Sequence, residues 1–177
     1  MKKGLVFWFS GLSGVGKTTV ANIVRQRLET SDFKVSVLDG DDIRNRLHRH
    51  LGFSDTDIKE NNKLIAGLCE SERLHADIIL VPIISPYVES RADARKQLSP
   101  GFFEIHLFAE ISILEERDTK GLYAKARNGE IENLIGYSPN SSYEPPEKPD
   151  IVINTGLISI NKSCDILMNF ILSQVGK

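Results

Sequence analysis

The chain has 177 residues, enough for one domain with a full hydrophobic core, and its 41% apolar and 26% charged residues are ordinary for a globular protein. The 22 lysines and arginines nearly balance the 24 aspartates and glutamates, so the net charge of −2 argues against a nucleic-acid or membrane-surface partner. No apolar segment is long enough to cross a bilayer, and two distant cysteines, Cys69 and Cys164, are expected as reduced, buried thiols of a cytoplasmic protein.

The first predicted element is a strand over residues 5–10, where the apolar run LVFWFS follows a charged start. That start faintly resembles a signal peptide, but the run is too short and leads directly into a glycine-rich segment. Apolar residues then recur at helical spacing, from Val20 and Ala21 through Val24 to Leu28. The order is therefore strand, glycine-rich loop, helix.

The loop between them, GLSGVGKTT over residues 11–19, fits the P-loop pattern G-x4-G-K-[ST]. Glycines let backbone N–H groups turn toward phosphate oxygens, and the helix that starts there adds its positive end. Lys17 is expected to reach the β- and γ-phosphates of ATP, and the Thr18 hydroxyl to bind Mg²⁺. A chance glycine-rich turn is the alternative, and the strand–loop–helix context argues against it. The predicted nucleotide-binding residues are Gly11, Ser13, Gly14, Gly16, Lys17, Thr18 and Thr19.

A second strand is predicted over residues 34–40, and acidic residues cluster where it ends, in LDGDDIR (38–44). A carboxylate at the carboxyl edge of a parallel sheet faces the ligand crevice, where it can bind Mg²⁺-bound water or accept a proton from a hydroxyl. This placement favours a small-molecule kinase. Turn and helix-cap duty is the alternative for Asp39, Asp41 and Asp42, and at least one of them is expected to do only that.

Two other classes of nucleotide-binding protein fit less well. A GTPase would carry an Asn-Lys-x-Asp motif for the base, and neither NKLI (62–65) nor NKSC (161–164) has the aspartate. Motor-type ATPases usually carry an acidic residue at the end of a buried strand, and the apolar run DIILVPIIS (77–85) ends without one.

Three further strands are predicted, over residues 77–85, 102–109 and 150–155. Strands separated by helices predict an α/β fold, a P-loop kinase fold with a parallel five-stranded sheet flanked by helices on both faces. No repeat or linker divides the sequence, so residues 1–177 are predicted to form a single domain. The proline-rich residues 137–149 are expected as a long surface connection of the kind that often forms a lid.

Several motifs, in order along nearly the whole chain, resemble the adenylylsulfate (APS) kinase family. Besides the P-loop and LDGD, they are LGFSDTDIKENN (51–62), ISPYVESRADAR (84–95) and ERDTKGLYAKARNGEI (116–131). The run RDxKGLYxKARxGEI is specific, because unrelated P-loop proteins do not carry it. In that family ATP phosphorylates the ribose 3′-hydroxyl of APS, which gives PAPS, the activated sulfate donor of sulfate assimilation.

The resemblance implies roles for individual residues, with Asp41 as the catalytic carboxylate beside Lys17 and Mg²⁺ held by Thr18 and Asp41. Phe53 would stack on the acceptor base, although without the resemblance it would be assigned to the core. A lid over about residues 117–147 would close on both substrates and exclude water. His48 and His50 are expected as polar surface residues, and the family suggests a homodimer. The implied acceptor-binding residues are Asp41, Arg44, Phe53, Ile58, Asn61, Ile84, Ser85, Lys120 and Leu134.

The sequence departs from the family at three positions on the acceptor side. Ile58 replaces an arginine that contacts the phosphate–sulfate end of the acceptor, and Leu134 replaces the phenylalanine that completes the base sandwich. Val88 stands where an arginine is common. The ATP side is unchanged, which suggests a different acceptor. One known relative of this kind phosphorylates cytidine diphosphoramidate on the 3′-hydroxyl in capsule biosynthesis.

Three interpretations therefore remain open for the acceptor side. The chain is an APS kinase that tolerates the changes, a kinase for cytidine diphosphoramidate, or a catalytically inactive nucleotide-sensing module with an eroded acceptor pocket. The complete P-loop, Asp41 and the lid motif count against the inactive module, which would not need to keep them.

Overall fold

The computed structural model describes residues 3–176 and contains one five-stranded parallel sheet in the order β2-β3-β1-β4-β5. Each strand lies inside its predicted range, so the α/β prediction is confirmed. The strands are β1 (Leu5–Ser10), β2 (Val35–Val37), β3 (Ile78–Val81), β4 (Phe102–Phe108) and β5 (Ile151–Asn154).

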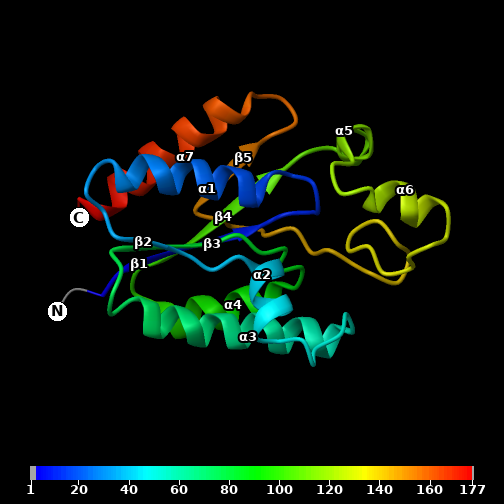
Figure 1. Cartoon of the computed structure of the whole chain (residues 1–177), viewed down its shortest axis with the longest axis horizontal. Coiled ribbons are helices and arrows are strands. Elements are labelled where there is room, and N and C mark those ends of the chain that lie inside the picture. The colour runs from blue at the N-terminus through cyan, green and yellow to red at the C-terminus, as the bar shows by residue number, and fades with distance from the viewer. Residues whose placement is uncertain (1–2, 177) are drawn as a thin grey trace.

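Helices cover both faces of the sheet, with α1 beside α7 on one face and α3 beside α4 on the other (Figure 1). Two short helices, α5 and α6, project beyond the end of the sheet where the strands finish. Within residues 3–176, no helix has both the length and the apolarity to cross a membrane. The helices are α1 (Lys17–Glu29), α2 (Gly40–Arg46), α3 (Asp55–Glu72), α4 (Val88–Leu98), α5 (Ile111–Arg117), α6 (Leu122–Arg127) and α7 (Ile160–Val175).

The central strand β1 is apolar on both faces because a helical layer covers each of them. Successive side chains of a strand point to opposite faces, so Phe7 and Phe9 enter one core with α1 and α7, while Val6 and Trp8 enter the other with α3 and α4. The two predicted buried thiols are confirmed as free and buried, one in each core. They are Cys164 of α7 and Cys69 of α3.

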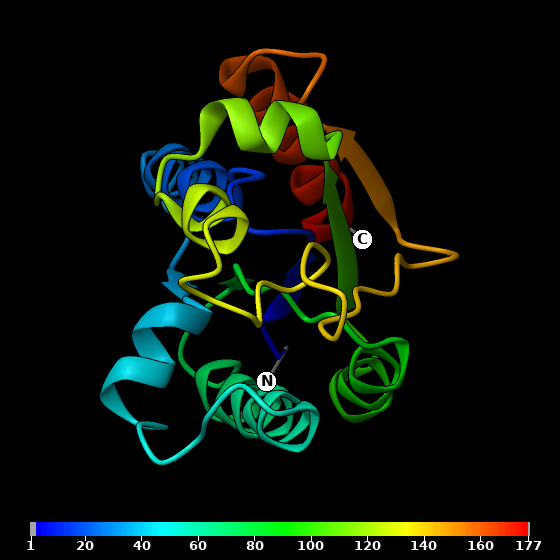
Figure 2. The ribbon, with the colours of Figure 1, turned by 90° about the vertical axis from the view of Figure 1, so that its right-hand side faces the viewer.

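The parallel arrangement brings the loops that follow β1, β2 and β3 to one edge of the sheet, as expected for a ligand crevice. Figure 2 looks at this edge, with α5, α6 and the connection that follows α6 in front of the strands. The P-loop, the acidic segment after β2 and the segment after β3 are therefore neighbours in space although they are far apart in sequence.

A buried arginine fastens the opposite edge of the sheet. Arg73, just after α3, is 4% exposed and donates hydrogen bonds to the backbone carbonyls of Gly4 (2.7 Å), Leu98 (2.6 Å) and Pro100 (2.5 Å). Gly4 lies just before β1, Leu98 is the last residue of α4, and Pro100 lies just before β4. One guanidinium therefore satisfies three main-chain acceptors, and its bonds to the Gly4 and Leu98 carbonyls are buried.

We expect Arg73→Leu to lower the free energy of unfolding by about 3 kcal/mol, because it leaves these carbonyls unpaired. Chemical denaturation measures the loss. Arg27→Leu is the control, since the Arg27 pair with Asp165 is exposed, and its effect should stay within about 0.5 kcal/mol. Equal losses in the two variants would contradict the role of Arg73.

Candidate functional site

A cavity of about 460 Å³ lies at the carboxyl edge of the sheet, between the P-loop, the start of α2 and the segment after α5. The predicted site residues that line it are Ser13, Gly14, Gly16, Lys17, Thr18, Thr19, Asp41, Phe53, Ile84, Lys120 and Leu134. Asp39, for which the sequence left crevice and cap roles open, also lines the cavity. The structure adds lining residues that the sequence did not indicate as contacts: Pro82, Ile83, Thr119, Leu122, Ile131, Asn133 and Ile135. The remaining predicted residues, Gly11, Arg44, Ile58, Asn61 and Ser85, lie outside this lining.

The P-loop forms as predicted, between β1 and α1. Gly16 occupies the left-handed region (φ 96°) as the N-cap of α1 and offers no capping side chain, so N–H groups of the first helical turn stay available for an anion. Gly11 does not line the cavity, but a Cβ there would lie 2.2 Å from the carbonyl oxygen of Leu107. Only glycine fits this close approach of the loop to β4.

Lys17 is buried at the base of the loop, where its ammonium donates to the carbonyls of Gly11 and Leu12, both at 2.8 Å. Burial lowers the pKa of Lys17 to about 7; the charge of Asp41 opposes this shift and that of Lys120 adds to it. The loop itself therefore holds the lysine in place at the P-loop end of the cavity.

Asp39 has two roles rather than the cap role alone. One carboxylate oxygen accepts from the backbone N–H groups of Asp41 (2.9 Å) and Asp42 (3.3 Å), which caps α2, and the other accepts from the Thr18 hydroxyl at 2.7 Å. Asp41 lies in the first turn of α2, and its carboxylate is 2.7 Å from the ammonium of Lys120. The acidic segment therefore meets both the P-loop and the predicted lid.

Oxygen ligands for Mg²⁺ are present at this end of the cavity. Thr18 supplies a hydroxyl, and Asp39 and Asp41 supply carboxylates, all three lining the same space as the P-loop. Mg²⁺ in kinase sites is usually bound by one or two such groups together with phosphate oxygens and water. The donor set fits this metal.

Phe53 is exposed at 60% and lines the cavity, so its assignment to the core is wrong. The guanidinium of Arg44 lies 4.9 Å from the centre of the Phe53 ring and donates to the carbonyls of Leu51 and Gly52. Arg44 thus supports the loop that presents the aromatic ring. The free ring face is suited to stacking on a nucleobase.

Ile58 and Asn61, both in α3, do not line the cavity. Ile58 is 5% exposed. Asn61 is 3% exposed, and its side-chain oxygen is 2.8 Å from Nδ1 of His48. The expectation that His48 lies at the surface is therefore wrong, because Asn61 gives it a buried partner, whereas His50 is exposed as expected.

The cations nearest in sequence to Ile58 do not take the place of the family arginine. Lys59 pairs with Glu89 at 2.6 Å, and Lys63 approaches Glu60 at 3.8 Å on the same helix. Among the residues that the structure describes, the cations lining the cavity are Lys17 and Lys120. The part of the cavity away from the P-loop is formed largely by apolar side chains, among them Ile83, Ile84, Ile131, Leu134 and Ile135.

The predicted lid region is anchored to the P-loop through Tyr123 of α6. Its side chain is buried, and its hydroxyl donates to the Ser13 carbonyl at 2.9 Å. The carboxylate of Asp118 caps α6 by accepting from the N–H groups of Ala124 (2.9 Å) and Tyr123 (3.1 Å), and these bonds hold the pKa of Asp118 below its ordinary value. The interpretation of Lys125 and Arg127 as exposed charges on a short helix is confirmed.

Comparison with known proteins places these features in one family. The family model described as adenylylsulphate kinase matches residues 3–154. An adenylyl-sulfate kinase of Synechococcus sp. (strain JA-3-3Ab) is 41% identical over 98% of this chain and 97% of its own length. One from Prochlorococcus marinus is 45% identical over 90% of this chain and 79% of its own.

Solved structures agree with these sequence matches. The Mycobacterium tuberculosis APS kinase CysC, in complex with AMPPNP and APS, superposes with a TM-score of 0.90 at 36% identity and covers 97% of this chain and 99% of its own. Shikimate kinase from Aquifex aeolicus, at 14% identity and a TM-score of 0.58 over 98% of this chain and all of its own, shares the fold alone.

Lys17 generates a testable prediction. Its pKa of about 7 in the free protein will be raised by bound phosphates, so nucleotide binding should take up close to one proton at about pH 8.5, between that value and the ordinary lysine pKa. Calorimetry of ADP binding in buffers of different ionisation enthalpy measures the uptake. Lys17→Met should remove it, and nucleotide binding to the unaltered chain without proton uptake would contradict the shifted pKa.

Proposed function

The chain belongs to the adenylylsulphate kinase family, and we propose that it transfers the terminal phosphoryl group of ATP to the ribose 3′-hydroxyl of a nucleotide, with adenylyl sulfate as the first candidate. The observation that carries this proposal is the single cavity shared by the P-loop, Asp41 and Lys120. A phosphate site and a carboxylate that can receive a hydroxyl proton open into the same space, as phosphoryl transfer to an alcohol requires.

Each residue of this cavity has a physical task in the proposed reaction. The P-loop N–H groups and Lys17 bind the phosphates of ATP, and Phe53 stacks on the acceptor base. Asp41 orients the 3′-hydroxyl and accepts its proton as the oxygen bonds to the phosphorus and ADP leaves. Lys120, which pairs with Asp41 in the free protein, balances charge at the transferring group. Most of the rate enhancement comes from positioning and electrostatics.

We assign the Mg²⁺ site to Thr18 and Asp41, with Asp39 holding the Thr18 hydroxyl. Bound there, the ion would offset negative charge on the phosphate oxygens. The segment of about residues 117–147 is assigned as the lid, since it supplies Lys120, Ile131, Asn133, Leu134 and Ile135 to the cavity. Closure of such a segment excludes water, so that phosphate passes to the hydroxyl.

We also propose that the chain forms a homodimer, because the family that it resembles suggests one. Analytical ultracentrifugation of the full chain tests this.

Cytidine diphosphoramidate is a second candidate acceptor, favoured by the positions of Ile58 and Leu134. Ile58 is buried and uncharged, and the cations that line the cavity, within residues 3–176, are the two on the phosphate side. Leu134 gives the base pocket an aliphatic wall in place of a second aromatic face. A smaller pyrimidine base would depend less on the missing second aromatic face. A phosphoramidate end group would depend less on the missing arginine.

Direct comparison of the two acceptors tests the proposal. We expect ADP release with Mg²⁺ and ATP to be stimulated by adenylyl sulfate or cytidine diphosphoramidate, and the ratio of their kcat/KM values identifies the acceptor. A strong preference for adenylyl sulfate would remove the altered-acceptor interpretation. Stimulation by no nucleotide at all would favour the inactive nucleotide-sensing module.

Replacement of Asp41 tests the catalytic assignment. We expect Asp41→Asn to lower kcat by about 10³-fold, because the amide cannot accept the hydroxyl proton, while the fold measured by circular dichroism stays intact. Asp42→Asn is the matched control, since Asp42 is the next residue of α2 and does not line the cavity. Near-normal turnover in Asp41→Asn would remove Asp41 from the mechanism.

A further inference from the structure

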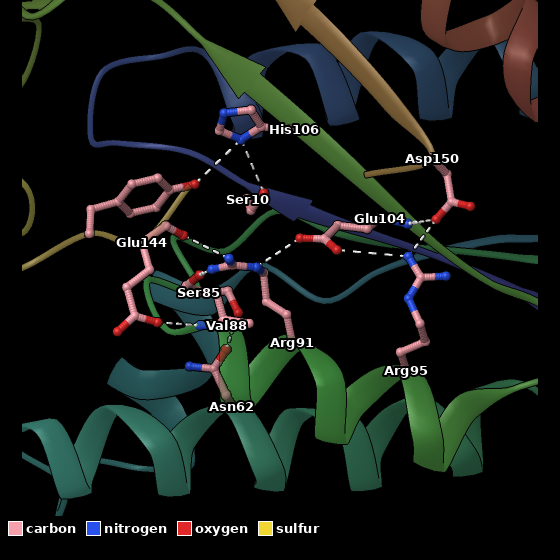
Figure 3. A network of polar contacts seen from close by, with 11 residues as sticks. Ser10, Asn62, Ser85, Val88, Arg91, Arg95, Glu104, His106, Glu144 and Asp150 are labelled. Carbon is pink, nitrogen blue, oxygen red and sulfur yellow. Dashed lines mark hydrogen bonds and ion pairs between the residues drawn. The ribbon is translucent and has the colours of Figure 1, made fainter. Parts of the chain in front are cut away.

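Arg91 of α4 is a buried arginine outside the cavity lining, and it bonds to the segment after β3 and to the connection after α6 (Figure 3). Both segments contribute residues to the cavity. Its side chain is 3% exposed. Nη1 donates to the Ser85 carbonyl at 2.7 Å, and Nη2 donates to the Glu144 carbonyl at 2.7 Å. Nε is 2.8 Å from Oε1 of Glu104, an ion pair that the buried charge needs. The planar fork of an arginine can make these contacts together, which a lysine cannot.

The first segment, after β3, is held in a strained conformation. Ser85 has φ 46°, a left-handed value that is unfavourable for a residue with a Cβ. Two contacts hold it there: its hydroxyl donates to the Asn62 side-chain oxygen at 2.6 Å, and its carbonyl accepts from Arg91. The adjacent Ile84 lines the cavity, and its carbonyl accepts from the Gly11 N–H at 3.4 Å. The backbone conformation at Ser85 therefore determines the position of Ile84 in the cavity wall.

The second segment, the connection after α6, is fixed to the first at Glu144. Its N–H donates to the Pro86 carbonyl at 2.9 Å, and its carboxylate accepts from the Val88 N–H at 2.7 Å, which caps α4 from a distant part of the chain. The N-cap of α4, Tyr87, makes no side-chain capping bond of its own. Together with the bond from Arg91, these contacts attach Glu144 to the start of α4.

Glu144 lies a short distance along the chain from Leu134 and Ile135, which form another part of the cavity wall. A bond from the Gly136 N–H to the Ser141 carbonyl (2.6 Å) closes the turn between them and Glu144. Tyr143, next to Glu144, also stacks on His106 of β4 with ring centres 6.2 Å apart. A shift of Glu144 would therefore be passed to the wall that carries Leu134.

We propose that Arg91 is a positioning residue for the acceptor, which fixes the spacing of the two walls by holding the carbonyls of Ser85 and Glu144 at once. The inference rests on the proposed function and deepens it, because Arg91 touches neither substrate and acts through Ile84 and Leu134. The P-loop receives no direct contact from it. Loss of the fork should therefore weaken acceptor binding more than ATP binding.

Arg95, one turn further along α4, provides a matched control. It approaches the same carboxylate, Glu104, at 3.7 Å and pairs with Asp150 at 2.6 Å. It bonds to neither Ser85 nor Glu144. Replacement by lysine keeps the positive charge at either position, so a comparison of the two variants separates the fork at Arg91 from the charge beside Glu104.

The experiment measures KM for the acceptor and for ATP, and kcat, in Arg91→Lys and Arg95→Lys, using whichever acceptor the full chain turns over. We expect Arg91→Lys to raise the acceptor KM about tenfold, from the loss of one charge-assisted hydrogen bond, with the KM for ATP changed less than about twofold. Arg95→Lys should leave both KM values within about twofold. A purely structural role would lower kcat with the fraction of folded protein and leave both KM values unchanged.

Glu144→Ala tests the same coupling without disturbing the buried guanidinium, in case Arg91→Lys folds poorly. It removes the carboxylate from the Val88 N–H and should raise the acceptor KM about threefold, with the KM for ATP unchanged. Equal acceptor KM values in Arg91→Lys and Arg95→Lys, or no change in Glu144→Ala, would overturn the inference. If the full chain turns over an acceptor but the variants behave alike, this inference is wrong and the proposed function still stands. If no acceptor stimulates turnover by the full chain, the proposed function itself is wrong.

Discussion

The parallel alignment of β1, β2 and β3 is the constraint on which the candidate site depends. Parallel strands finish at the same edge, so the P-loop, the segment that begins with Asp39 and the segment that contains Ser85 meet although long stretches of chain separate them. A helical layer on each face keeps the strands in register. The P-loop, the Asp41 carboxylate and the cavity wall that carries Ile84 therefore take their relative positions from the hydrogen bonds of one sheet.

The sequence was sufficient for the elements whose signal is local. The apolar runs predicted all five strands, and the P-loop pattern predicted the strand–loop–helix unit, because glycine spacing and periodicity are read from neighbouring residues. Contacts between distant residues carried no such signal. Arg91 meets Glu144 across 53 positions of sequence, and Ser85 gives no local sign of its left-handed backbone. His48 was misplaced for the same reason, since it lies in the loop after α2 whereas its partner, Asn61, lies on α3.

The two sides of the cavity differ in how their chemistry is built. On the phosphate side, charged and polar groups are packed against one another: Lys17 on loop carbonyls, Thr18 on Asp39 and Lys120 on Asp41. On the acceptor side the lining is largely aliphatic, with Phe53 as its exposed aromatic ring. Hydrogen bonds and ion pairs fix the side chains at the P-loop end of the cavity, whereas the packing of aliphatic side chains sets the form of the other end.

The close approach of Gly11 to the Leu107 carbonyl makes the nucleotide loop part of the packing between β1 and β4. Because no side chain fits at that position, the separation of these two strands and the curvature of the loop cannot vary independently. A substitution in this half of the molecule is compatible with the fold only if it keeps both, whereas the loops and wall residues at the far end of the cavity are not subject to this steric limit.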